Sequence, residues 1–544
     1  MFDDSITPSS AVARYDAILI GTGVNGMFQL IRLRELGLSV RAFEAAGDVG
    51  GTWYWNRYPG CRFDSESYTY IHSFSQELLN EWDWSEHFSA QPDTLRYCNY
   101  VADKFDLRKD IQFNARVTSA VFNEAHNEWE ITLADGSRAR SRYFVTALGP
   151  LSTPVIPSFE GIDSFKGESH HTGLWPHTPV DFAGRRVAVI GTGASGVQLI
   201  QTIAKTVDHL TVFQRRPNWC SPLNNAPIDA EEMNRIRARY TEIFAKCRDS
   251  EGGFIHVVDP RKAGEVSAQE REEVFERLYQ TPGFAIWLAN FYDTFTDQTA
   301  NDFITEFVAR KIRGRVNDPA IAERLIPKDH GFGTRRVPME SGYYEVYNQN
   351  NVELVSTLET PIERITPTGL RVGGKDYAFD IIIYATGFDA MLGAYNQIDI
   401  RGCGGQSLKE KWAEVPRTFL GVQVAGFPNM MMVIGPHTGA SFCNMPRCGE
   451  ENVDFVTDLI RFTQTKGFSR VQPSVESEIA WTEHVHQVAE KLLINKTDSW
   501  FTGINRNIEG RQTRRVLLYA GGATRYRRKC DEQVASGYAG FEFR

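Results

Sequence analysis

Two stretches of the chain share one pattern of hydrophobic and polar positions. Residues 15–47 and residues 186–216 each begin with an apolar run, pass through a glycine-rich turn, continue with apolar positions at helical spacing and end in a second apolar run. This order predicts a strand, a helix and another strand in each stretch. The repeat therefore predicts an α/β protein that contains two βαβ units of similar build.

The pattern between and after these units predicts the remaining organisation. Apolar and polar positions alternate through residues 111–149, on both sides of a turn at 134–137, which predicts strands. Proline and glycine punctuate residues 150–167, as is typical of a linker. Residues 227–330 contain long charged runs with apolar positions at helical spacing, so we expect a helical insertion. An apolar run typical of a strand appears again within residues 377–390.

Each βαβ unit carries a turn with the spacing G-x-G-x-x-G, formed by Gly21, Gly23 and Gly26 and by Gly191, Gly193 and Gly196. In such a turn the first glycine permits the tight bend, the second lets the backbone approach a pyrophosphate, and the third lets helix and strand pack closely. The diphosphate then lies against free N–H groups at the helix N-terminus. Both units are therefore expected to bind a dinucleotide, and Ser195 is counted among the cofactor-binding residues of the second.

The two units differ where their second strand ends. The first ends at Glu44, and the second has Gln214 at the same offset, followed by Arg215 and Arg216. A carboxylate there accepts hydrogen bonds from ribose hydroxyls and repels a 2′-phosphate, whereas guanidinium groups pair with phosphate. We therefore expect FAD or NAD at the first site and NADP at the second. The alternative is that the two arginines are only a solvated strand end.

Two dinucleotide sites on one chain predict a flavin fold with separate FAD and NADP domains. Such a pair of cofactors indicates hydride transfer from NADPH to the flavin and delivery of the electrons to a further substrate. The predicted domains, in chain order, are the first part of the FAD domain (1–149), the linker and first part of the NADP domain (150–226), the helical insertion (227–330), the second part of the NADP domain (331–390) and the C-terminal part of the FAD domain (391–544).

Composition narrows the class of protein. The chain has 544 residues, 42% of them hydrophobic, with a net charge of −9 and a pI near 5.8. A nucleic-acid or anionic-membrane surface normally needs a basic surplus, so neither partner is expected. No apolar run approaches the length of a membrane helix, and the polar N-terminus is unlike a secretory signal. The eight cysteines show no metal or CxxC spacing, which predicts reduced thiols in a cytoplasmic compartment.

Three further features carry candidate chemistry. His170, His171 and His177 lie within eight positions, which first suggests a metal or catalytic loop, but no set of metal partners accompanies them and we expect no metal. Arg335 and Arg336 are adjacent in a loop before an expected helix; the alternative is a surface basic pair. Asp64, in a glycine- and aromatic-rich loop at residues 48–67 where no helix is expected, could hold one of these arginines or merely cap a turn.

At these residues the chain resembles the type I Baeyer–Villiger monooxygenases, of the cyclohexanone and phenylacetone monooxygenase kind. The resemblance extends over almost the whole chain, including the GTRR segment at 333–336 and DSWFTG at 498–503. The family's linker motif, F-x-G-x-x-x-H-x-x-x-W-[P/D], is complete in Phe165, Gly167, His171, Trp175 and Pro176. A second signature is matched by Gly50, Gly51, Trp53, Tyr58, Pro59, Gly60 and Asp64.

The resemblance implies a reaction. NADPH reduces FAD, O2 forms a C4a-peroxyflavin, and attack on a ketone yields an ester or lactone; sulfides are a further implied substrate class. It implies that Arg336 is the catalytic cation and that Asp64 orients it. Arg335, where the family usually has lysine, is expected to touch the NADP 2′-phosphate with Arg215. Trp500 is expected near the nicotinamide, Gly51, Thr52 and Trp53 at the cofactor, and His171 in a hinge-like linker.

Alternatives remain at this stage. A flavin-containing N- or S-monooxygenase of the same two-dinucleotide fold is the first. A disulfide reductase would need a cysteine pair soon after the first site, where only Cys61 occurs, and a non-catalytic NADP-binding regulator would not need the Asp64–Arg336 pairing. His437 and Arg447 could line a ketone pocket or face solvent. We expect a monomer or small homo-oligomer that acts on small molecules.

Overall fold

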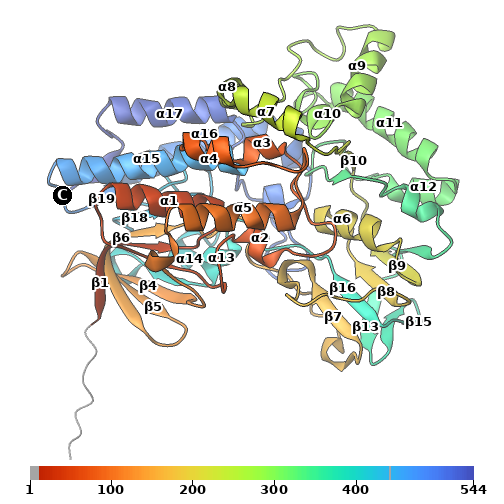
Figure 1. Ribbon diagram of the computed structural model, residues 1–544, viewed down its shortest axis with the longest axis horizontal. Coiled ribbons are helices and arrows are strands. Elements are labelled where there is room, and N and C mark those ends of the chain that lie inside the picture. The colour runs from red at the N-terminus through yellow and green to blue at the C-terminus, as the bar shows by residue number, and fades with distance from the viewer. Residues whose placement is uncertain (1–11, 440–442) are drawn as a thin grey trace, which may run out of the picture.

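The structure is a computed structural model that describes residues 12–439 and 443–544, so the polar N-terminal stretch lies outside it up to residue 11. Two separate sheets lie at the lower left and lower right of Figure 1. The first sheet has the order β17-β4-β5-β6-β1-β2-β3, and β18 pairs with β6. Its strands are β1 (Ala13–Ile20), β2 (Val40–Phe43), β3 (Ile111–Gln112), β4 (Val117–Asn123), β5 (Glu128–Leu133), β6 (Arg138–Thr146), β17 (Asp399–Arg401) and β18 (Met430–Met432).

The second sheet is parallel throughout, in the order β12-β9-β8-β16-β7. Its central strands are buried along almost their whole length, as a sheet covered on both faces requires. The strands are β7 (Glu168–His171), β8 (Arg186–Ile190), β9 (His209–Gln214), β12 (Val352–Ser356) and β16 (Ile381–Tyr384), with a small antiparallel sheet of β13 (Ile362–Thr366), β14 (Gly369–Val372) and β15 (Lys375–Ala378) beside them.

The two predicted βαβ units are confirmed. Helix α1 (Val24–Glu35) connects the parallel strands β1 and β2, and α6 (Ala194–Ile203) connects β8 and β9. The predicted strands on both sides of the turn at 134–137 are also present, as the antiparallel pair β5 and β6. The strand pattern expected at 377–390 is also present, divided between β15 and β16, which belong to different sheets.

Helices make up most of the segment expected to be a helical insertion, at the upper right of Figure 1. The amphipathic run at 229–248 is two helices, because Arg239 leaves helical geometry (φ −111°, ψ 8°). Asp229, Ser267, Asp297 and Asp318 each cap the helix that follows with a side-chain oxygen. The helices are α7 (Ala230–Ala238), α8 (Tyr240–Asp249), α9 (Ala268–Gln280), α10 (Ala285–Leu288), α11 (Gln298–Arg315) and α12 (Pro319–Leu325).

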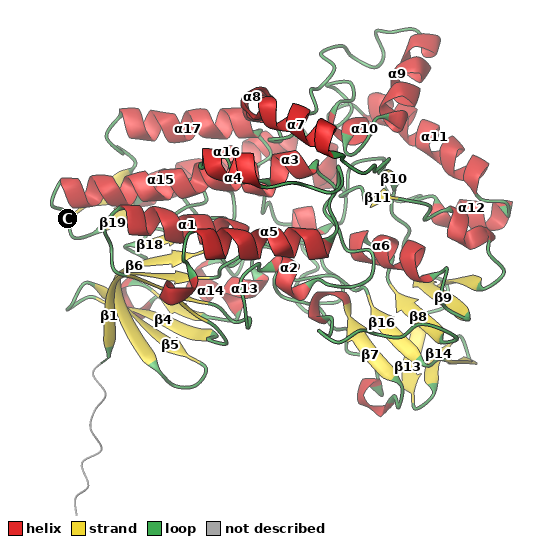
Figure 2. Cartoon of the chain, in the orientation of Figure 1, coloured by secondary structure: helices red, strands yellow, loops and turns green. Residues whose placement is uncertain are grey.

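Most of the other helices form a layer above the first sheet (Figure 2). Within this layer α15 packs against α1, and Gly449 of α15 lets the two approach, because a Cβ there would collide with the Asn25 side chain. The remaining helices are α2 (Thr52–Trp55), α3 (Ser67–Tyr70), α4 (Gln76–Glu81), α5 (Gln91–Lys104), α13 (Gly393–Asn396), α14 (Leu408–Lys411), α15 (Met445–Thr465), α16 (Val475–Glu490) and α17 (Ala523–Ala535). Two short strand pairs lie outside the larger sheets: β10 (Ser221–Pro222) with β11 (Met339–Glu340), and β19 (Val471–Pro473) with β20 (Phe541–Phe543).

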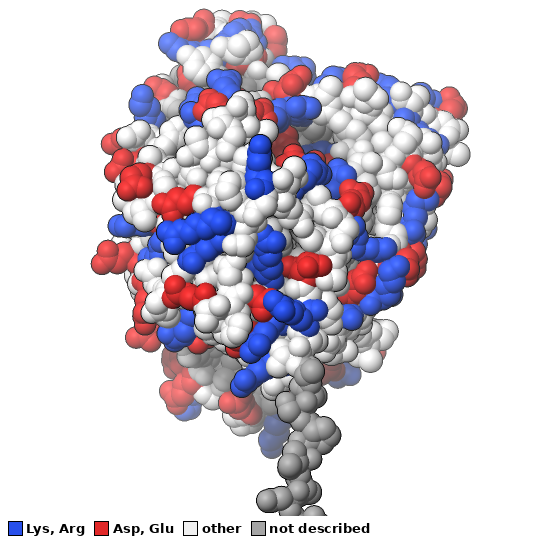
Figure 3. Space-filling model, turned by 90° about the vertical axis from the view of Figure 1, so that its left-hand side faces the viewer, with Lys and Arg blue, Asp and Glu red and all other residues white. Residues whose placement is uncertain are grey.

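Basic and acidic side chains are interspersed over the face shown in Figure 3. None of the helices in the described part of the chain is long and apolar enough to cross a membrane.

Candidate functional site

The first glycine turn follows β1 and has no room for a side chain at Gly21 or Gly26. Gly21 has φ +93°, and a Cβ there would lie 2.5 Å from the Ala147 carbonyl oxygen; a Cβ on Gly26 would collide with the Gly21 carbonyl. Gly51 faces the same turn, since its Cβ would lie 2.9 Å from the Gly23 Cα. Helix α1 begins directly after Gly23, so no side chain of that residue can cap the first N–H groups. The turn can therefore present them to a diphosphate.

Glu44 directly follows β2 beside this turn and is buried. Its carboxylate accepts hydrogen bonds from Thr22, from the backbone N–H at 2.8 Å and the hydroxyl at 3.0 Å, and from the Ala46 N–H at 2.8 Å. These donors keep a charged acceptor at the carboxyl end of the strand. The cradle of bare glycines and the fixed acceptor together fit the diphosphate and ribose of a dinucleotide without a 2′-phosphate.

The second turn repeats the first after β8. Gly191 has φ +109° and a Cβ there would lie 2.5 Å from the Ala385 carbonyl oxygen, while Gly196 packs against Gly191 itself. A Cβ on Gly193 would meet no described atom within 4 Å, so the middle of this turn is open to a ligand. Ser195 is half-buried in the first turn of α6.

A basic cluster surrounds the end of β9. Arg216 and Arg335 each lie 3.1 Å from the Asp329 carboxylate, and Arg215 donates a 2.9 Å hydrogen bond to the Asn507 side chain. Partial burial and the neighbouring guanidinium groups of Arg216, Arg506 and Arg335 lower the pKa of Arg215. The structure therefore brings together all three arginines that the sequence assigned to the second dinucleotide. Guanidinium groups this close repel one another, and a bound anion such as a phosphate would relieve the repulsion. The cluster is therefore suited to bind phosphate.

The Asp64–Arg336 pair lies where the two units meet. Arg336 Nη2 is 2.7 Å from Asp64 Oδ2; the Asp64 side chain is fully buried, whereas 28% of the Arg336 side chain is exposed. Asp64 also accepts hydrogen bonds of 3.3 Å from the Gln198 side chain and from the Met339 N–H. The guanidinium of Arg336 lies 5.8 Å from the centre of the Phe284 ring. A fixed positive charge thus borders an aromatic surface.

The loop that carries Asp64 is seated on α6. Gly60 has φ +82°, and a Cβ there would collide with Thr202 and lie 2.5 Å from the Gln198 carbonyl oxygen of that helix. The Tyr58 hydroxyl donates a 2.8 Å hydrogen bond to Gln198 Oε1. Gln198 thereby joins the first unit to the second. The sequence analysis missed this residue; the one available signal was its place one turn into the helix of the second unit. Residues 48–67 also contain one helical turn, α2, where none was expected, since the glycines before it leave its start free.

The segment after Arg336 differs from its prediction in one respect. The expected helix is absent from this described segment: Met339 and Glu340 form β11, and only a 3-10 turn follows, at Glu345–Asn348. Strand β11 pairs with β10, and the buried Glu340 carboxylate forms an ion pair with Arg315 at 2.6 Å. These contacts, rather than a helix, anchor the arginine pair.

The linker motif is built around a strand of the second sheet. A Cβ on Gly167 would lie 2.5 Å from both the Phe165 ring and the Asp380 carbonyl oxygen. His171 ends β7 and is buried, and its Nδ1 accepts a 2.9 Å hydrogen bond from the Gly173 N–H. Burial lowers the pKa of His171 to about 4. Trp175 is buried and Pro176 half-buried. Trp175 packs in the main hydrophobic core and Phe165 against the smaller core that contains Ala188 and Ile190, so the motif contributes to both.

The three histidines of this stretch do not converge. His170 pairs with Glu168 at 3.2 Å, and the ring of His177 lies 4.8 Å from that of Tyr54 in the loop after the first turn. Among the described residues, no group of three or more His, Cys, Asp or Glu side chains could hold a metal ion.

Trp500 lies in a 3-10 turn (Trp500–Thr502) and is half-buried, with its ring centre 4.3 Å from that of Phe501. Just before it, Thr497 donates a 3.1 Å hydrogen bond to Thr334, the residue that precedes the arginine pair. The C-terminal loop and the arginine segment are therefore in direct contact.

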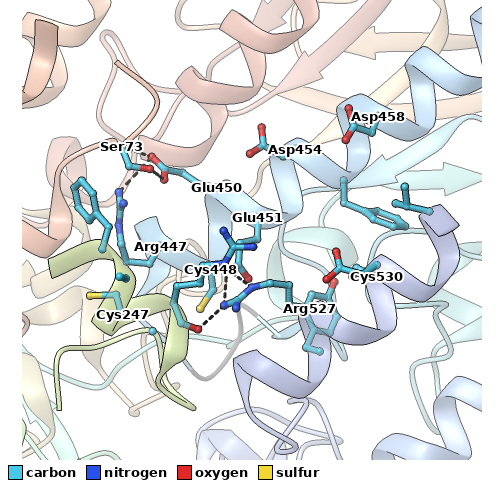
Figure 4. A pocket seen from close by; sticks show the side chains of 18 of the residues that line it. Ser73, Cys247, Arg447, Cys448, Glu450, Glu451, Asp454, Asp458, Arg527 and Cys530 are labelled. Atoms are coloured by element: carbon cyan, nitrogen blue, oxygen red, sulfur yellow. Dashed lines mark hydrogen bonds and ion pairs between the residues drawn. The ribbon is translucent and has the colours of Figure 1, made fainter. Parts of the chain in front are cut away.

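Neither His437 nor Arg447 faces solvent, so that alternative is wrong for both. His437 is fully buried, with Nε2 2.9 Å from the Val516 carbonyl oxygen, and burial lowers its pKa to about 4. Arg447 is buried at the start of α15, where it bonds to the Ile71 carbonyl and lies 3.2 Å from Glu450. It lines a cavity of about 540 Å³ between α8, α15 and α17 (Figure 4), which does not include Arg336.

Cys443 and Cys448 form a disulfide, so the expectation of eight reduced thiols is wrong for this pair. The start of α15 brings the two residues together, with their Cα atoms 6.4 Å apart. The other six cysteines are free: Cys61, Cys98, Cys220, Cys247, Cys403 and Cys530.

A family model described as "Flavin-binding monooxygenase-like" matches residues 15–236. The chain is 45% identical over 533 residues to the 2-oxo-Delta(3)-4,5,5-trimethylcyclopentenylacetyl-CoA monooxygenase of Pseudomonas putida, covering 97% of this chain and 98% of the relative. It is 41% identical over 530 residues to a phenazine N-monooxygenase of Lysobacter antibioticus and 40% identical over 529 residues to a Baeyer–Villiger monooxygenase of Pseudooceanicola batsensis, in both cases over 97% of this chain and 96% of the relative.

A solved structure described as OTEMO in complex with FAD and NADP superimposes on the chain with a TM-score of 0.94. The two share 45% sequence identity, over 97% of this chain and 99% of the other. At this level of identity and coverage the likeness includes the cofactor turns as well as the fold.

Proposed function

Because the chain belongs to the Baeyer–Villiger monooxygenases, flavoproteins that use FAD and NADPH to insert one oxygen atom of O2 beside a ketone carbonyl, we propose that the Asp64–Arg336 pair is its catalytic centre. The observation that carries this proposal is the 2.7 Å ion pair between a fully buried carboxylate and a partly exposed guanidinium at the junction of the two dinucleotide units. The product of the overall reaction is an ester or lactone.

The two glycine turns supply the places for the two cofactors. The first turn, with Glu44 and the adjoining residues Gly51, Thr52 and Trp53, suits FAD, because it offers bare N–H groups and an acceptor for ribose. The second turn, with the basic cluster at the end of β9, suits NADPH. When bound, FAD accepts reducing equivalents from NADPH and passes them to O2.

Arg336 contributes a positive charge that persists at every working pH, because a guanidinium is not deprotonated in proteins. In a partly desolvated site it stabilises negative charge on an oxygen and can polarise a ketone carbonyl. Asp64 is a positioning residue: its buried carboxylate fixes the guanidinium by a charge-assisted hydrogen bond. The buried Phe284 ring beside Arg336 makes the surroundings of the guanidinium apolar on that side.

We propose the domain division that the sequence predicted. The first sheet with its helices, from 1–149 and 391–544, would form the FAD domain, and 150–226 with 331–390 the NADP domain, interrupted by the insertion at 227–330. The support is that every strand of the second sheet lies between residues 168 and 384. The motif around His171 would be the connection between the two domains, since it ends a strand of one and reaches Tyr54 of the other through His177.

We further propose that the enzyme works in the cytoplasm as a monomer or small homo-oligomer, on small molecules rather than nucleic acid or membranes. The six free cysteines support the cytoplasm, and the net charge of −9 supports the exclusion of nucleic acid and anionic membranes.

A second candidate activity is oxygenation of nitrogen or sulfur. The similarity to a phenazine N-monooxygenase at 41% identity favours it, because that relative is as similar to the chain as the Baeyer–Villiger enzyme at 40%. We propose that sulfides are accepted as additional substrates.

One experiment tests these proposals together. The purified chain is incubated with FAD, NADPH and O2 and with matched panels of ketones, sulfides and aromatic nitrogen heterocycles, and the products are identified by mass spectrometry. Esters or lactones from ketones are expected. N-oxides or sulfoxides without any ester from the ketone panel would overturn the ketone assignment in favour of the second candidate.

A further inference from the structure

The basic cluster at the end of β9 includes one arginine that the sequence did not assign to it. Arg506 lies on the C-terminal loop, almost three hundred residues from Arg215 in the chain. The next residue, Asn507, accepts the 2.9 Å hydrogen bond from Arg215, which places this part of the loop directly at the predicted 2′-phosphate site. Arg506 itself bonds to the Asp498 carboxylate at 2.9 Å.

The cluster has more positive than negative charge. Its four guanidinium groups, on Arg215, Arg216, Arg335 and Arg506, share two carboxylates: Asp329 pairs with two of them and Asp498 with Arg506. Two positive charges therefore stay uncompensated, even before Arg514, the second partner of Asp498, is counted. A phosphate monoester carries about −1.5 to −2 charges at pH 7, which matches this excess.

One donor within the cluster also lacks a partner. Arg335 Nε is buried and makes no hydrogen bond to any described residue, and the Arg335 side chain is only 16% exposed. A buried guanidinium N–H without an acceptor is costly. An acceptor that enters the cluster would satisfy it.

We propose that Arg506, together with Asn507, forms the fourth side of the NADPH 2′-phosphate site, so that the phosphate is held between the second dinucleotide unit and the C-terminal loop. Arg506 then makes a charge-assisted hydrogen bond to the phosphate in place of, or in addition to, its bond to Asp498. In the same step Asn507 keeps Arg215 directed at the phosphate. The inference rests on the proposed placement of NADPH at the second glycine turn.

The placement has a consequence for specificity. Arg506, which would distinguish NADPH from NADH, lies on the loop that carries Trp500. The position of this loop would therefore depend on whether a 2′-phosphate is bound. NADPH would hold the loop against the arginine segment, where Thr497 already contacts Thr334 at 3.1 Å, and NADH would not.

The test compares the binding of NADP⁺ and NAD⁺, which differ only in the 2′-phosphate, to the FAD-loaded full chain by calorimetry. Arg506→Gln is expected to weaken NADP⁺ binding about tenfold, as loss of one charge-assisted phosphate contact predicts, and to change NAD⁺ binding less than about twofold. Arg506→Lys should recover part of the loss, since it keeps the charge. Asp498→Asn, which removes the competing carboxylate, should raise the preference for NADP⁺.

Arg514→Gln is the matched control, because Arg514 also pairs with Asp498 but makes no contact with Arg215 that the described residues show. It should leave the ratio of the two affinities unchanged. An Arg506→Gln enzyme that retains the wild-type ratio, or an equal loss in Arg514→Gln, would overturn the role of Arg506. A wild-type enzyme that binds both nucleotides equally would instead contradict the NADPH assignment of the whole cluster.

Discussion

Gln198 donates a 3.3 Å hydrogen bond to Asp64, across the junction between the second dinucleotide helix and the loop that follows the first. The same amide donates to the Arg62 carbonyl at 3.0 Å and accepts from the Tyr58 hydroxyl at 2.8 Å. One buried side chain on α6 thus holds the partner of Arg336 in place. These hydrogen bonds fix the loop that carries Asp64 to helix α6.

Replacing Gln198 by Leu should lower the stability of the enzyme by about 1–3 kcal/mol, because the Tyr58 hydroxyl and the Arg62 carbonyl would each lose a hydrogen-bond partner in a buried place. It should also reduce the yield of ester per NADPH consumed, since Asp64 loses a contact that orients it. Thermal unfolding and product yield measure the two effects. Gln201→Leu, one helical turn further along α6, is the control; a yield that falls equally there would argue against a specific role.

Arg336→Ala should still permit reduction of the flavin by NADPH but should lower ketone oxygenation by about 100-fold or more, because the fixed positive charge at the reacting oxygens is lost. Stopped-flow absorbance follows the reduction and chromatography the ester. The substitution also leaves Asp64 as a buried, unpaired carboxylate, so Arg336→Lys provides a variant that keeps the charge. If the Ala variant forms ester at a comparable rate, Arg336 is not the catalytic cation.

Arg215→Ala should raise the KM for NADPH by about tenfold or more while changing the KM for NADH little, because only NADPH carries the phosphate that the guanidinium would bind. Steady-state kinetics with both nucleotides give the comparison. Equal changes for the two nucleotides would exclude recognition of the 2′-phosphate by Arg215.

The buried His171 makes stability depend on pH. Its pKa falls from an ordinary value of 6.5 to about 4 on folding, so its neutral form is favoured in the folded state. The contribution is complete above pH 6.5 and is lost as the pH falls toward 4, because the unfolded chain then binds the extra proton. His171→Asn should therefore make the loss of stability between pH 7 and pH 5 smaller by about 2 kcal/mol.

Urea unfolding at the two pH values measures this difference. His126→Asn, at an exposed position, is the matched control. An unchanged pH dependence in His171→Asn would mean that another buried group, such as His437 with its similarly lowered pKa, accounts for it.

The disulfide between Cys443 and Cys448 predicts a definite thiol count. Alkylation of the denatured, non-reduced chain should label six cysteines, and prior reduction should raise the number to eight. Intact-mass spectrometry reads both values. In Cys443→Ser all seven remaining cysteines should be labelled without reduction; eight labels on the non-reduced wild-type chain would show that the pair is reduced in solution.

The parts of this enzyme that depend on local geometry could be predicted from the sequence. A G-x-G-x-x-G turn needs its glycines wherever it occurs, since Gly21 and Gly191 both adopt positive φ and pack against a carbonyl. Helix caps and strands with alternating apolar and polar positions could be predicted as well, because they too depend on residues that are neighbours in the chain. Helix breaks, as at Arg239, depend on packing that no local pattern records.

The site residues divide in a similar way. The residue types made Arg336 and Asp64 candidates, but only the motifs of a known family assigned their roles, because their contact spans 272 positions that no local pattern bridges. Gln198, Asp329 and Arg506 escaped prediction because each acts at a junction of distant segments: Gln198 contacts the loop that carries Asp64, Asp329 pairs with Arg216, and Arg506 lies next to the Asn507 that Arg215 contacts. His437 looked ambiguous as a lone polar residue after a turn, and only the folded structure shows that it is buried, with its ring nitrogen against the Val516 carbonyl.

The order of the strands has a consequence for synthesis of the chain. All strands of the second sheet have been made once residue 384 has left the ribosome, but the first sheet still lacks β17 and β18, which lie at 399–401 and 430–432. The first sheet, whose first strand is synthesised earliest, is thus the last of the two sheets to be completed. A chain truncated before Met430 would retain every strand of the second sheet beside a first sheet without β18, and the end of β6 would expose an edge that another chain could occupy.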